Sequence, residues 1–405
     1  MQLRSIESGY SGWLGGTGLV NFRSGNLGYE HLAALEAPFE ASTPLGYNGR
    51  FTLVARPVFL DSGQADGSAT LRVQEQTATG TALVNIPAPI GTLTATASTP
   101  PAQQNAVGIG GELQLAFPQL ALAAGYTPGG FLVSTLTGRA LWKPDNGPIT
   151  LNLSRDSVRD TQLSYAGLRD PAGQAQGADG QTWGGVVANL AQVQFSSGDA
   201  DAGFYAGVGG QYLTGSHVQI NTRIDGSGGA YWRLKTVPEY GTLNVGVNFF
   251  AMHYAHNEQA FTHGMGGYFS PQLYFLANVP FNWAGHAGTR WHYNAQGSAG
   301  VQAYQQHLTP LYPLAVDKPL EGLLNHAMLP AKTSVGANYD VHSQVSYQIA
   351  EHWFAGGFFS ANNTRNYSAV SAGFSVHYLF RPQPSTVSGP TGLFSADGLR
   401  PFTVP

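Results

Sequence analysis

The 405-residue sequence contains no cysteine and few charged residues. Without cysteine the chain has no disulfides, thiolate zinc sites, iron–sulfur clusters or cysteine nucleophiles. Lys, Arg, Asp and Glu make up 10% of the residues, against about 25% in a typical soluble domain. The net charge is −4, so the chain has no basic surface with which to follow the phosphates of a nucleic acid. Nucleic acid is therefore not an expected partner.

Long hydrophobic runs are also missing. The most apolar region, 113–133, is interrupted by Gln114, Pro118, Gln119, Gly125 and the run 128–130. A membrane-spanning helix needs about 20 consecutive apolar residues, so helical spans are excluded. Residues 1–29 have neither the basic start nor the apolar core of a signal peptide. We expect them to form a linker.

Glycine and aromatic residues are abundant, and apolar residues alternate with other residues in short segments. Between residues 241 and 254, Leu243, Val245, Val247 and Phe249 alternate with Asn244, Gly246, Asn248 and Phe250. Between residues 272 and 284, one face carries Leu273, Phe275, Ala277, Val279, Phe281 and Trp283, and the other carries Tyr274, Asn278 and Asn282. A period of two residues indicates β-strands, because a helix repeats every 3.6 residues.

The alternation recurs in residues 50–61, 149–156, 290–301, 335–349 and 370–380. A soluble sandwich presents Lys, Glu and Thr to water, whereas here the polar face consists of Asn, Gln, Ser, Gly and aromatic residues. Closure into a barrel satisfies every backbone group in lipid and leaves no sheet edge. We therefore expect an all-β fold, a transmembrane antiparallel β-barrel of about 16 strands. A soluble β-rich core is the alternative.

Aromatic residues near segment ends match the girdles of a barrel at its two membrane interfaces. They are Trp142, Trp232, Trp283, Trp291, Trp353 and Tyr378. The expected division of the chain is a linker over 1–29, a barrel over 30–380 and a tail over 381–405. The tail is rich in proline, so it is not a strand, and we expect it at the pore mouth or in the lumen. A short amphipathic helix is expected over 317–329, in a rim loop.

The expected register assigns each side chain to a face. Inward residues include Arg50, Arg56, Asn244, Asn248, Tyr274, Asn278, Asn282, Arg290, Asn294 and Gln296. Lipid-facing residues include Leu243, Val247, Phe275, Val279, Phe281, Phe374 and Val376. The pattern Ser371-x-Gly373-x-x-Val376-x-Tyr378 resembles the signal by which insertion machinery recognises a last strand.

Charged residues form two groups on the expected inner face. Glu36 and Glu40 lie opposite the apolar face of their segment, and Arg50 and Arg56 follow on the next strand. Mutual ion pairs would brace the wall, and a solute-binding role is the alternative. The second group runs from Arg155 to Asp170 and is either a constriction or a solvated loop.

Standard catalytic motifs are absent, including G-x-S-x-G, S-x-x-K, the P-loop and H-E-x-x-H. Isolated acids (Asp156, Asp160 and Asp170) and histidines (His253, His256, His263, His292 and His342) are present, but their spacing fits no catalytic or metal site. We expect no enzyme activity, no metal and no cofactor.

The most distinctive stretch is Thr262-His-Gly-Met-Gly-Gly-Tyr-Phe-Ser-Pro-Gln-Leu-Tyr274. Tyr268, Phe269 and Tyr274 offer ring faces beside the hydroxyl of Ser270 and the amide of Gln272. Such a combination suits a sugar ring, which stacks its C–H groups and hydrogen-bonds through its hydroxyls. The alternative is an aromatic cluster at the membrane interface.

At this stretch the sequence resembles the C-terminal barrel of the bacterial cellulose synthase C subunit. Supporting matches are 35–38, 49–61, 154–167, 183–186, 213–215 and 248–254. The resemblance implies a 16-stranded outer-membrane barrel that releases a nascent β-1,4-glucan. It also implies a periplasmic tetratricopeptide-repeat region and an inner-membrane synthase as partners.

We therefore expect an outer-membrane porin that exports a neutral polysaccharide, with cellulose as the leading candidate. Export of another exopolysaccharide and general diffusion are the alternatives. The residues expected to line the channel or contact the substrate are Glu36, Glu40, Arg50, Arg56, Asn244, Asn248, Tyr268, Phe269, Tyr274, Asn278, Asn282 and Arg290.

Overall fold

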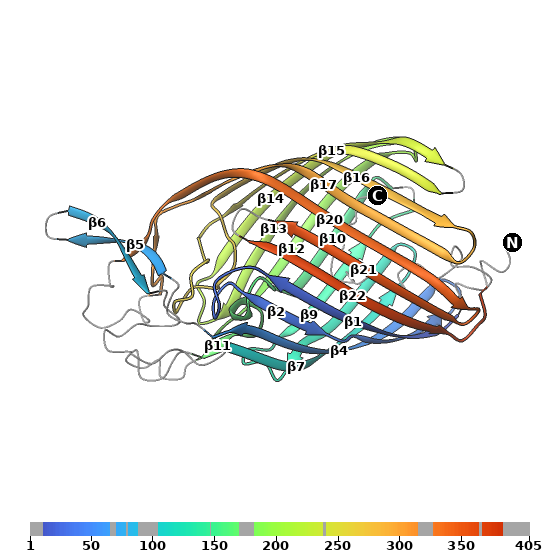
Figure 1. Cartoon of the computed structure of the whole chain (residues 1–405), viewed down its shortest axis with the longest axis horizontal. Coiled ribbons are helices and arrows are strands. Elements are labelled where there is room, and N and C mark those ends of the chain that lie inside the picture. Colours follow the sequence, from blue (N-terminus) through green and yellow to red (C-terminus); the bar gives the residue numbers. More distant parts are fainter. Residues whose placement is uncertain are drawn as a thin grey trace.

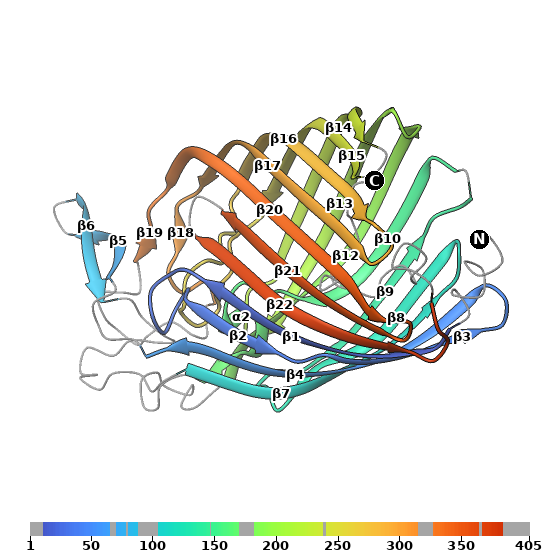
Figure 2. The same ribbon diagram turned by 45° about the vertical axis from the view of Figure 1, so that its right-hand side comes forward.

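The protein is described from a computed structural model, which describes residues 11–64, 70–77, 80–87, 104–145, 147–169, 182–237, 240–314, 327–363 and 367–383. Its dominant feature is one large antiparallel sheet that closes on itself (Figures 1 and 2). Alternating apolar residues on one face favour this sheet, because only a closed sheet leaves no unpaired backbone edge in lipid.

The barrel has sixteen strand positions. They are occupied in order by β1 (Trp13–Arg23), β2 (Leu32–Glu36) with β3 (Phe39–Leu45), β4 (Gly49–Gly63), β7 (Gln104–Ala116), β8 (Leu120–Gly129), β9 (Leu136–Trp142), β10 (Ile149–Ser157), β12 (Thr182–Gly198), β13 (Ala202–Ser216), β14 (Asn221–Val237), β15 (Gly241–Tyr254), β16 (Leu273–Ala287), β17 (Trp291–Gln306), β20 (Lys332–Ala350), β21 (Trp353–Asn363) and β22 (Ser368–Leu379). Strands β2 and β3 share one position because both pair with β1 and β4. The expected all-β barrel of about 16 strands is confirmed.

Strand β1 closes the barrel. It pairs with β22 from Trp13 opposite Leu379 to Arg23 opposite Ala369. The expectation that residues 1–29 form a linker is therefore wrong for Trp13–Arg23. Glycines at three positions of this strand weaken its alternation, so the hydrophobic pattern that marks the other strands is faint here.

The two rims differ in the length of their connections. Short connections such as 46–48, 117–119, 199–201 and 288–290 join strands at one rim, where β1 begins and β22 ends. Long connections such as 158–181, 255–272 and 307–327 leave the other, which we call the long-loop rim. Beyond it, β5 (Thr70–Thr77) and β6 (Gly80–Pro87) form a hairpin at the left of Figure 1. The hairpin belongs to a small sheet with β18 (Thr309–Pro310) and β19 (Met328–Leu329).

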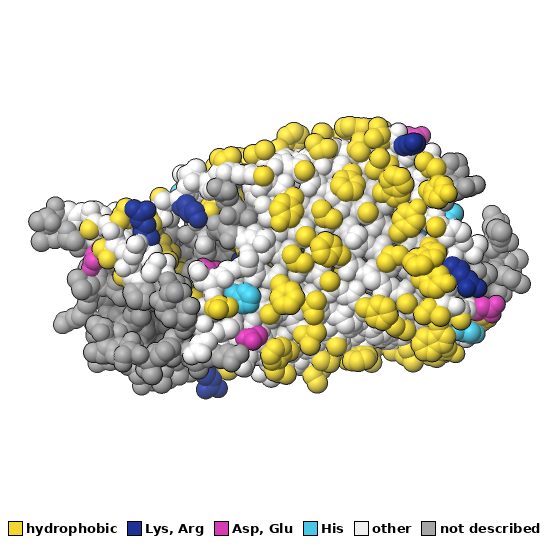
Figure 3. All heavy atoms as spheres, viewed as in Figure 1, with side chains coloured by type: hydrophobic (Ala, Val, Ile, Leu, Met, Phe, Trp, Pro, Cys, Tyr) yellow, Lys and Arg dark blue, Asp and Glu magenta, His cyan; other side chains and the backbone are white. Residues whose placement is uncertain are grey.

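The expected alternation of faces is present in the barrel wall. Phe249, Val279 and Phe374 are 61%, 58% and 58% exposed on the outside, as expected for side chains that face lipid. Figure 3 shows hydrophobic side chains spread over the outer wall and charged side chains near its two ends. This distribution matches an apolar band between two polar membrane boundaries.

Helix is nearly absent from the described residues. Beside β11 (Leu168–Arg169) lies α2 (Gln162–Ala166), which Thr161 caps through its side chain and the Ser164 backbone N–H. Within the described ranges, no helix has the length and apolar character needed to cross a membrane. Of the helix expected over 317–329, residues 317–326 lie outside the described residues, and Met328–Leu329 form strand β19 instead of helix. In the tail, residues 384–405 also lie outside the described residues.

Candidate functional site

The barrel interior is the candidate functional site, and its wall differs from one side to the other. Strands β15, β16 and β17 contain no Lys, Arg, Asp or Glu. Their inward positions include Asn244, Asn248, Tyr274, Asn278, Asn282, Asn294 and Gln296. In the ring of sixteen positions β16 stands twelfth and β7 fourth, so the two strands lie on opposite sides of the lumen.

The wall around β7 carries charge, and Glu36 is at the centre of its first cluster. Glu36 Oε2 lies 3.7 Å from Arg56 Nε, and Glu36 Oε1 lies 3.7 Å from Arg159 Nη1. The Arg159 guanidinium also lies 4.8 Å from the centroid of the Tyr165 ring. The ion pair expected between Glu36 and Arg56 is therefore present, and Arg159 joins it from the segment after β10.

Arg139 of β9 forms a second charged cluster with Asp156 of the adjacent β10 and Glu112 of β7, which lies beyond β8. Its Nε lies 2.7 Å from Asp156 Oδ2, and its Nη2 lies 3.3 Å from Glu112 Oε2. Neither Glu112 nor Arg139 was among the residues expected at the site from the sequence. Their positions alternate with apolar neighbours, so the period-2 pattern itself contained the signal.

A cavity of about 300 Å³ lies between the Glu36 cluster and the strands that close the barrel. Its lining includes Glu36, Arg56 and Arg159 on one side and His342 of β20 and Ser371 of β22 on the other. The cavity is thus part of the lumen and is bounded by Asp160 and Tyr165 of the segment after β10.

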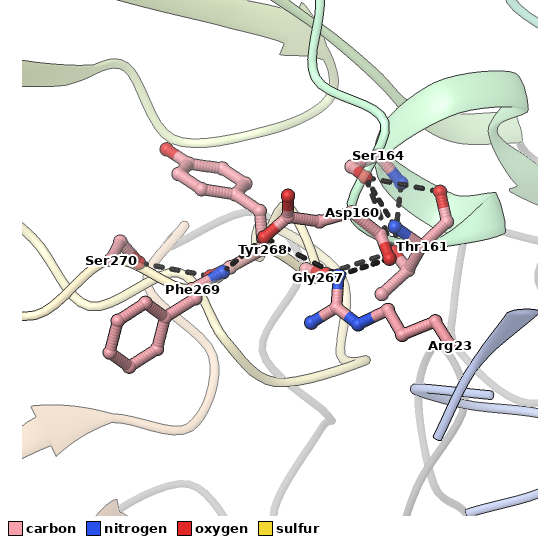
Figure 4. A network of polar contacts seen from close by, with 8 residues as sticks. All are labelled: Arg23, Asp160, Thr161, Ser164, Gly267, Tyr268, Phe269 and Ser270. Carbon is pink, nitrogen blue, oxygen red and sulfur yellow. Dashed lines mark hydrogen bonds and ion pairs between the residues drawn. The ribbon is translucent and has the colours of Figure 1, made fainter. Parts of the chain in front are cut away.

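Two long connections are joined to each other at the long-loop rim. We call the segments 158–169 and 255–272 the clasp. Asp160 Oδ2 accepts a hydrogen bond from the Phe269 backbone N–H at 3.0 Å, and Thr161 Oγ1 donates to the Gly267 carbonyl at 2.9 Å. Figure 4 shows both contacts beside Arg23 of β1. Arg23 donates to the Asp160 carbonyl and lies 3.5 Å from its carboxylate.

Further contacts attach the clasp to other parts of this rim. Ser62 of β4 donates to the Gln162 side chain at 3.0 Å. The Tyr29 and Phe261 rings meet edge to face at 5.6 Å. Thr262 donates to the Leu311 carbonyl. The sequence left open whether the charged group from Arg155 to Asp170 forms a constriction or a solvated loop. In its described part, Arg159 and Asp160 line the lumen cavity, as a constriction would.

The distinctive stretch 262–274 forms the buried part of the clasp. Tyr268 is 2% exposed, and its hydroxyl accepts a hydrogen bond from Asn221 Nδ2 at 3.0 Å. Its ring packs in a cluster with Leu163, Trp183 and Val186. Since Ser270 and Gln272 are also buried, the hypothesis of a sugar platform open to the lumen is wrong for this conformation.

Phe269 and Tyr274 are buried as well, at 9% and 6% exposure. The Phe269 ring meets the Tyr304 ring edge to face at 5.3 Å and the Tyr274 ring at 6.2 Å. The glycines shape this fold, since Gly264 and Gly267 have φ of +92° and +69°, a region in which residues with a Cβ are strained. The rings therefore stabilise the clasp.

Glu258 is fully buried in the clasp. Its Oε2 accepts a hydrogen bond from the Gly266 N–H at 3.1 Å, and its Oε1 has no hydrogen-bond partner within the described part of the chain. Burial raises the pKa of the Glu258 carboxyl well above its usual range, and the Gly266 hydrogen bond opposes this only in part. Glu258 was not expected at the site, because nothing in the neighbouring sequence predicts its burial.

The remaining expected lining residues differ in position. Arg50 points inward, and its guanidinium donates to the Ser42 hydroxyl at 3.0 Å and the Ser11 carbonyl at 3.2 Å. Glu40 alternates inward on β3. Arg290 was expected on an inner face, but it lies exposed in the turn after β16. Strand β17 begins at Trp291, one residue later than the alternation predicted.

The histidines considered as metal ligands are scattered. His253 is exposed at the end of β15, whereas the His263 ring stacks on Trp183 at 4.7 Å. Burial lowers the pKa of His263 to about 4, with a smaller contribution from His217. Among the described residues, no three His, Asp or Glu side chains are grouped as metal ligands. Asp170 lies outside the described residues.

A closed antiparallel sheet with an apolar outer wall and a polar interior defines the protein as a bacterial outer-membrane β-barrel. Comparison with known families is more specific. The model of the family "Cellulose synthase operon protein C C-terminus" matches residues 30–381, and the chain belongs to this family. The expected relationship to the cellulose synthase C subunit is thereby confirmed.

Curated relatives carry the same name. Cellulose synthase operon protein C of Pseudomonas fluorescens is 29% identical over 380 residues, which cover 91% of this chain and 27% of the relative. The protein of that name from Komagataeibacter xylinus is 34% identical over 208 residues, covering 51% of this chain and 15% of the relative. The chain thus spans about a quarter or less of these relatives' length.

Solved outer-membrane barrels also align with the chain. OccK9 of Pseudomonas aeruginosa aligns over 91% of this chain and 98% of its own, with a TM-score of 0.34 and 10% identity. OprB of Pseudomonas putida aligns over 94% of this chain and 95% of its own, with a TM-score of 0.34 and 9% identity.

Proposed function

We propose that this barrel is the exit pore for a nascent, uncharged polysaccharide, with β-1,4-glucan as the leading candidate. The observation that carries the proposal is the uncharged inner wall of β15–β17 in a member of a cellulose-operon family. A charged polymer would need a lumen of opposite charge. Here the described charges on the opposite wall include the mutually compensated clusters of Glu36 and Arg139.

The rims suggest the direction of transport. Outer-membrane barrels have short periplasmic turns and longer extracellular loops, so the rim with short turns would receive the chain. A periplasmic tetratricopeptide-repeat region and an inner-membrane synthase are the partners that this direction requires. The outer wall contacts lipid. The clasp would then lie at the extracellular end, and it would have to move for a polymer to leave.

Two other functions have weaker support. Export of a different exopolysaccharide would use the same barrel, but a uronate or aminosugar chain would favour a charged path. General diffusion of small solutes is disfavoured by the clasp, whose buried contacts join several segments across the long-loop rim. We propose no catalytic role, since the candidate acids Asp156 and Asp160 take part in ion pairs.

The proposal is tested in a bacterium that produces cellulose and whose own barrel region has been replaced by this one. The polymer is measured separately in the medium and in the periplasm, with and without residues 11–383 of this chain. We expect glucan in the medium only when the barrel is present. Equal glucan in the medium without the barrel would contradict the proposal.

A second assay separates the pore from an enzyme. Purified barrel is incubated with phospholipid vesicles and with a denatured protein, and free fatty acid and new peptide ends are measured. We expect neither product to exceed the level given by the heat-unfolded barrel. Release of either product by the folded barrel alone would favour a hydrolase.

A further inference from the structure

The lumen wall contains a row of hydrogen-bonded side chains that come from four strands, β13, β15, β16 and β17. Tyr205 of β13 donates to Asn248 Oδ1 of β15 at 2.7 Å. Asn248 Nδ2 donates to Asn278 Oδ1 of β16 at 3.1 Å, and Asn278 Nδ2 donates to Ser298 Oγ of β17 at 3.1 Å. We call these four residues the amide row. It runs across the strands, and β14 contributes no side chain to it.

Glycines hold the amide row flat against the wall. Gly229 of β14 is paired with Asn248, and a Cβ on Gly229 would lie 2.6 Å from the Tyr205 hydroxyl oxygen. Gly300 of β17 is paired with Asn278, and a Cβ there would lie 2.5 Å from the Asn278 Cβ. A side chain at Gly229 or Gly300 would push Tyr205 or Asn278 away from the wall. The two glycines therefore allow the row to lie along the wall.

The two amides of the row keep hydrogen-bonding groups that their neighbours in the row do not use. A side-chain amide has two N–H donors and an oxygen with two lone pairs. In the row, Asn248 and Asn278 each use one donor and one lone pair on their neighbours. Both side chains are half-buried on the inner face. Each amide therefore keeps one donor and one acceptor, which together match the donor and acceptor character of a sugar hydroxyl.

A second pair of amides repeats this arrangement further along the barrel. Asn294 Nδ2 donates to Asn282 Oδ1 at 2.9 Å, and Asn282 is paired with Asn244. Asn244 and Asn248 are four residues apart, or about 13 Å along a strand. With strands tilted by about 40°, this is about 10 Å along the barrel axis, similar to a disaccharide unit of an extended β-1,4-linked chain.

The opposite wall does not provide an equivalent surface. Several of its carboxylates and guanidiniums are committed to one another, as in the contacts of Arg139 with Glu112 and Asp156. A neutral sugar there would have to displace charge-assisted hydrogen bonds without offering a charge in return. The asymmetry of the lumen thus directs an uncharged chain towards β15–β17.

We propose that the amide row and the Asn282–Asn294 pair form the track along which the glucan moves, hydrogen-bonding successive disaccharide units through their hydroxyl groups. The inference rests on the proposed export of a glucan and assigns its contact surface. It places the polymer against one wall of the lumen. The alternative is that the amides only brace the wall, in which case their free donors and acceptors contact water.

Binding of cellohexaose to the folded barrel in detergent micelles tests the track, with isothermal titration calorimetry as the measurement. The test variants are Asn248→Leu and Asn278→Leu, which keep the branched four-atom shape of the side chain and remove its amide. We expect each variant to bind about fivefold more weakly for each amide–sugar hydrogen bond lost, from the roughly 1 kcal/mol of one such bond. Heat-modified migration on gels checks that every variant is folded.

The matched control is Asn152→Leu on β10. Asn152 is 1% exposed, so its amide is not available to a sugar, and we expect unchanged affinity. If both track variants bind as tightly as the unmodified barrel, or if the control loses affinity equally, the track is wrong. Absence of binding by the unmodified barrel would also overturn the track, whereas glucan export is judged separately by the location of the polymer in cells.

Discussion

At the scale of single residues, the clasp depends on a few polar contacts made by buried and half-buried side chains. Asp160 connects both clasp segments to the barrel wall through Phe269 and Arg23. Glu258 is enclosed on the other side of the same segment, where its backbone carbonyl accepts a hydrogen bond from the Gly267 N–H at 2.7 Å. The stability of the clasp should therefore respond to the charge on these two carboxyl groups.

Replacement of Asp160 by asparagine should loosen the clasp. The new amide would keep an oxygen for the Phe269 N–H but would carry no charge towards Arg23. Hydrogen bonds to charged groups contribute about 1.5–3 kcal/mol, so we expect the open probability in planar bilayers to rise roughly tenfold or more. Asp201→Asn is the control, because its ion pair with Arg233 lies exposed at the other rim. Equal open probability in Asp160→Asn and the unmodified barrel would contradict this role.

Raising the pH should also loosen the clasp, through Glu258. Because burial raises the pKa of Glu258 in the folded clasp, its stabilising contribution is complete below the unfolded pKa and is lost as the pH rises through the folded pKa. We expect open probability in planar bilayers to increase as the pH rises above the ordinary range of a carboxyl pKa. Tyr268, Tyr254 and Asp160 are nearby titratable groups, so Glu258→Gln is the matched control. A pH response of the same size in Glu258→Gln would assign the effect to another group.

At the scale of strands, closure of the barrel depends on contacts between β1, β21 and β22. A Cβ on Gly373 of β22 would lie 2.3 Å from the Phe358 ring and 2.7 Å from the Gly18 carbonyl oxygen. A Cβ on Gly18 of β1 would meet nothing within 4 Å. The two glycines are thus close in space and very different in their tolerance of a side chain.

Gly373→Ala should destabilise the barrel, whereas Gly18→Ala should leave it nearly unchanged. Overpacking of this kind costs about 1–3 kcal/mol. Urea unfolding in micelles, followed by tryptophan fluorescence, measures the difference in the free energy of unfolding. Charged residues at Gly373 and Tyr378 should further reduce insertion in cells, through loss of the last-strand signal. Equal stability of the two alanine variants would show that the Gly373 contacts relax without cost.

Deletion of Trp13–Arg23 should prevent closure. The deletion removes every partner that β22 has on its β1 side over these eleven register positions, leaving an edge strand in lipid. We expect loss of the heat-modifiable folded band and of outer-membrane protein in cell fractions. Deletion of residues 1–10 is the comparison and should retain the folded band. A folded barrel after removal of Trp13–Arg23 would mean that β22 closes against another strand.

The strands could largely be predicted from the sequence, and the clasp could not. Alternation identifies β15 and β16 because each residue's face depends only on its neighbours along the chain. Burial of Tyr268 depends on Leu163 and Trp183, which are distant in sequence, so ring-rich sequence was compatible with an open platform or a packed core. Arg290 shows the limit at strand ends, where one residue decides between a wall and a turn.

At the scale of the whole molecule, the lumen combines the uncharged wall of β15–β17, an opposite wall that carries the ion pairs of Glu36 and Arg139, and the clasp at the long-loop rim. Together these features predict selectivity by polymer charge once the clasp is open. A neutral chain has the uncharged wall of β15–β17 available, whereas a polyanion finds Arg56, Arg139 and Arg159 of the opposite wall already engaged with acids. The barrel should therefore pass uncharged oligosaccharides in preference to charged ones of equal length.

Efflux from proteoliposomes that contain the Asp160→Asn barrel tests this central claim most directly. Vesicles are loaded with labelled cellohexaose or with a galacturonate oligomer of equal length, and the released label is measured over time. We expect cellohexaose to leave much faster than the galacturonate oligomer, and neither to leave vesicles without protein. Release of both at the same rate, or of the galacturonate oligomer alone, would contradict a pore for neutral glucan.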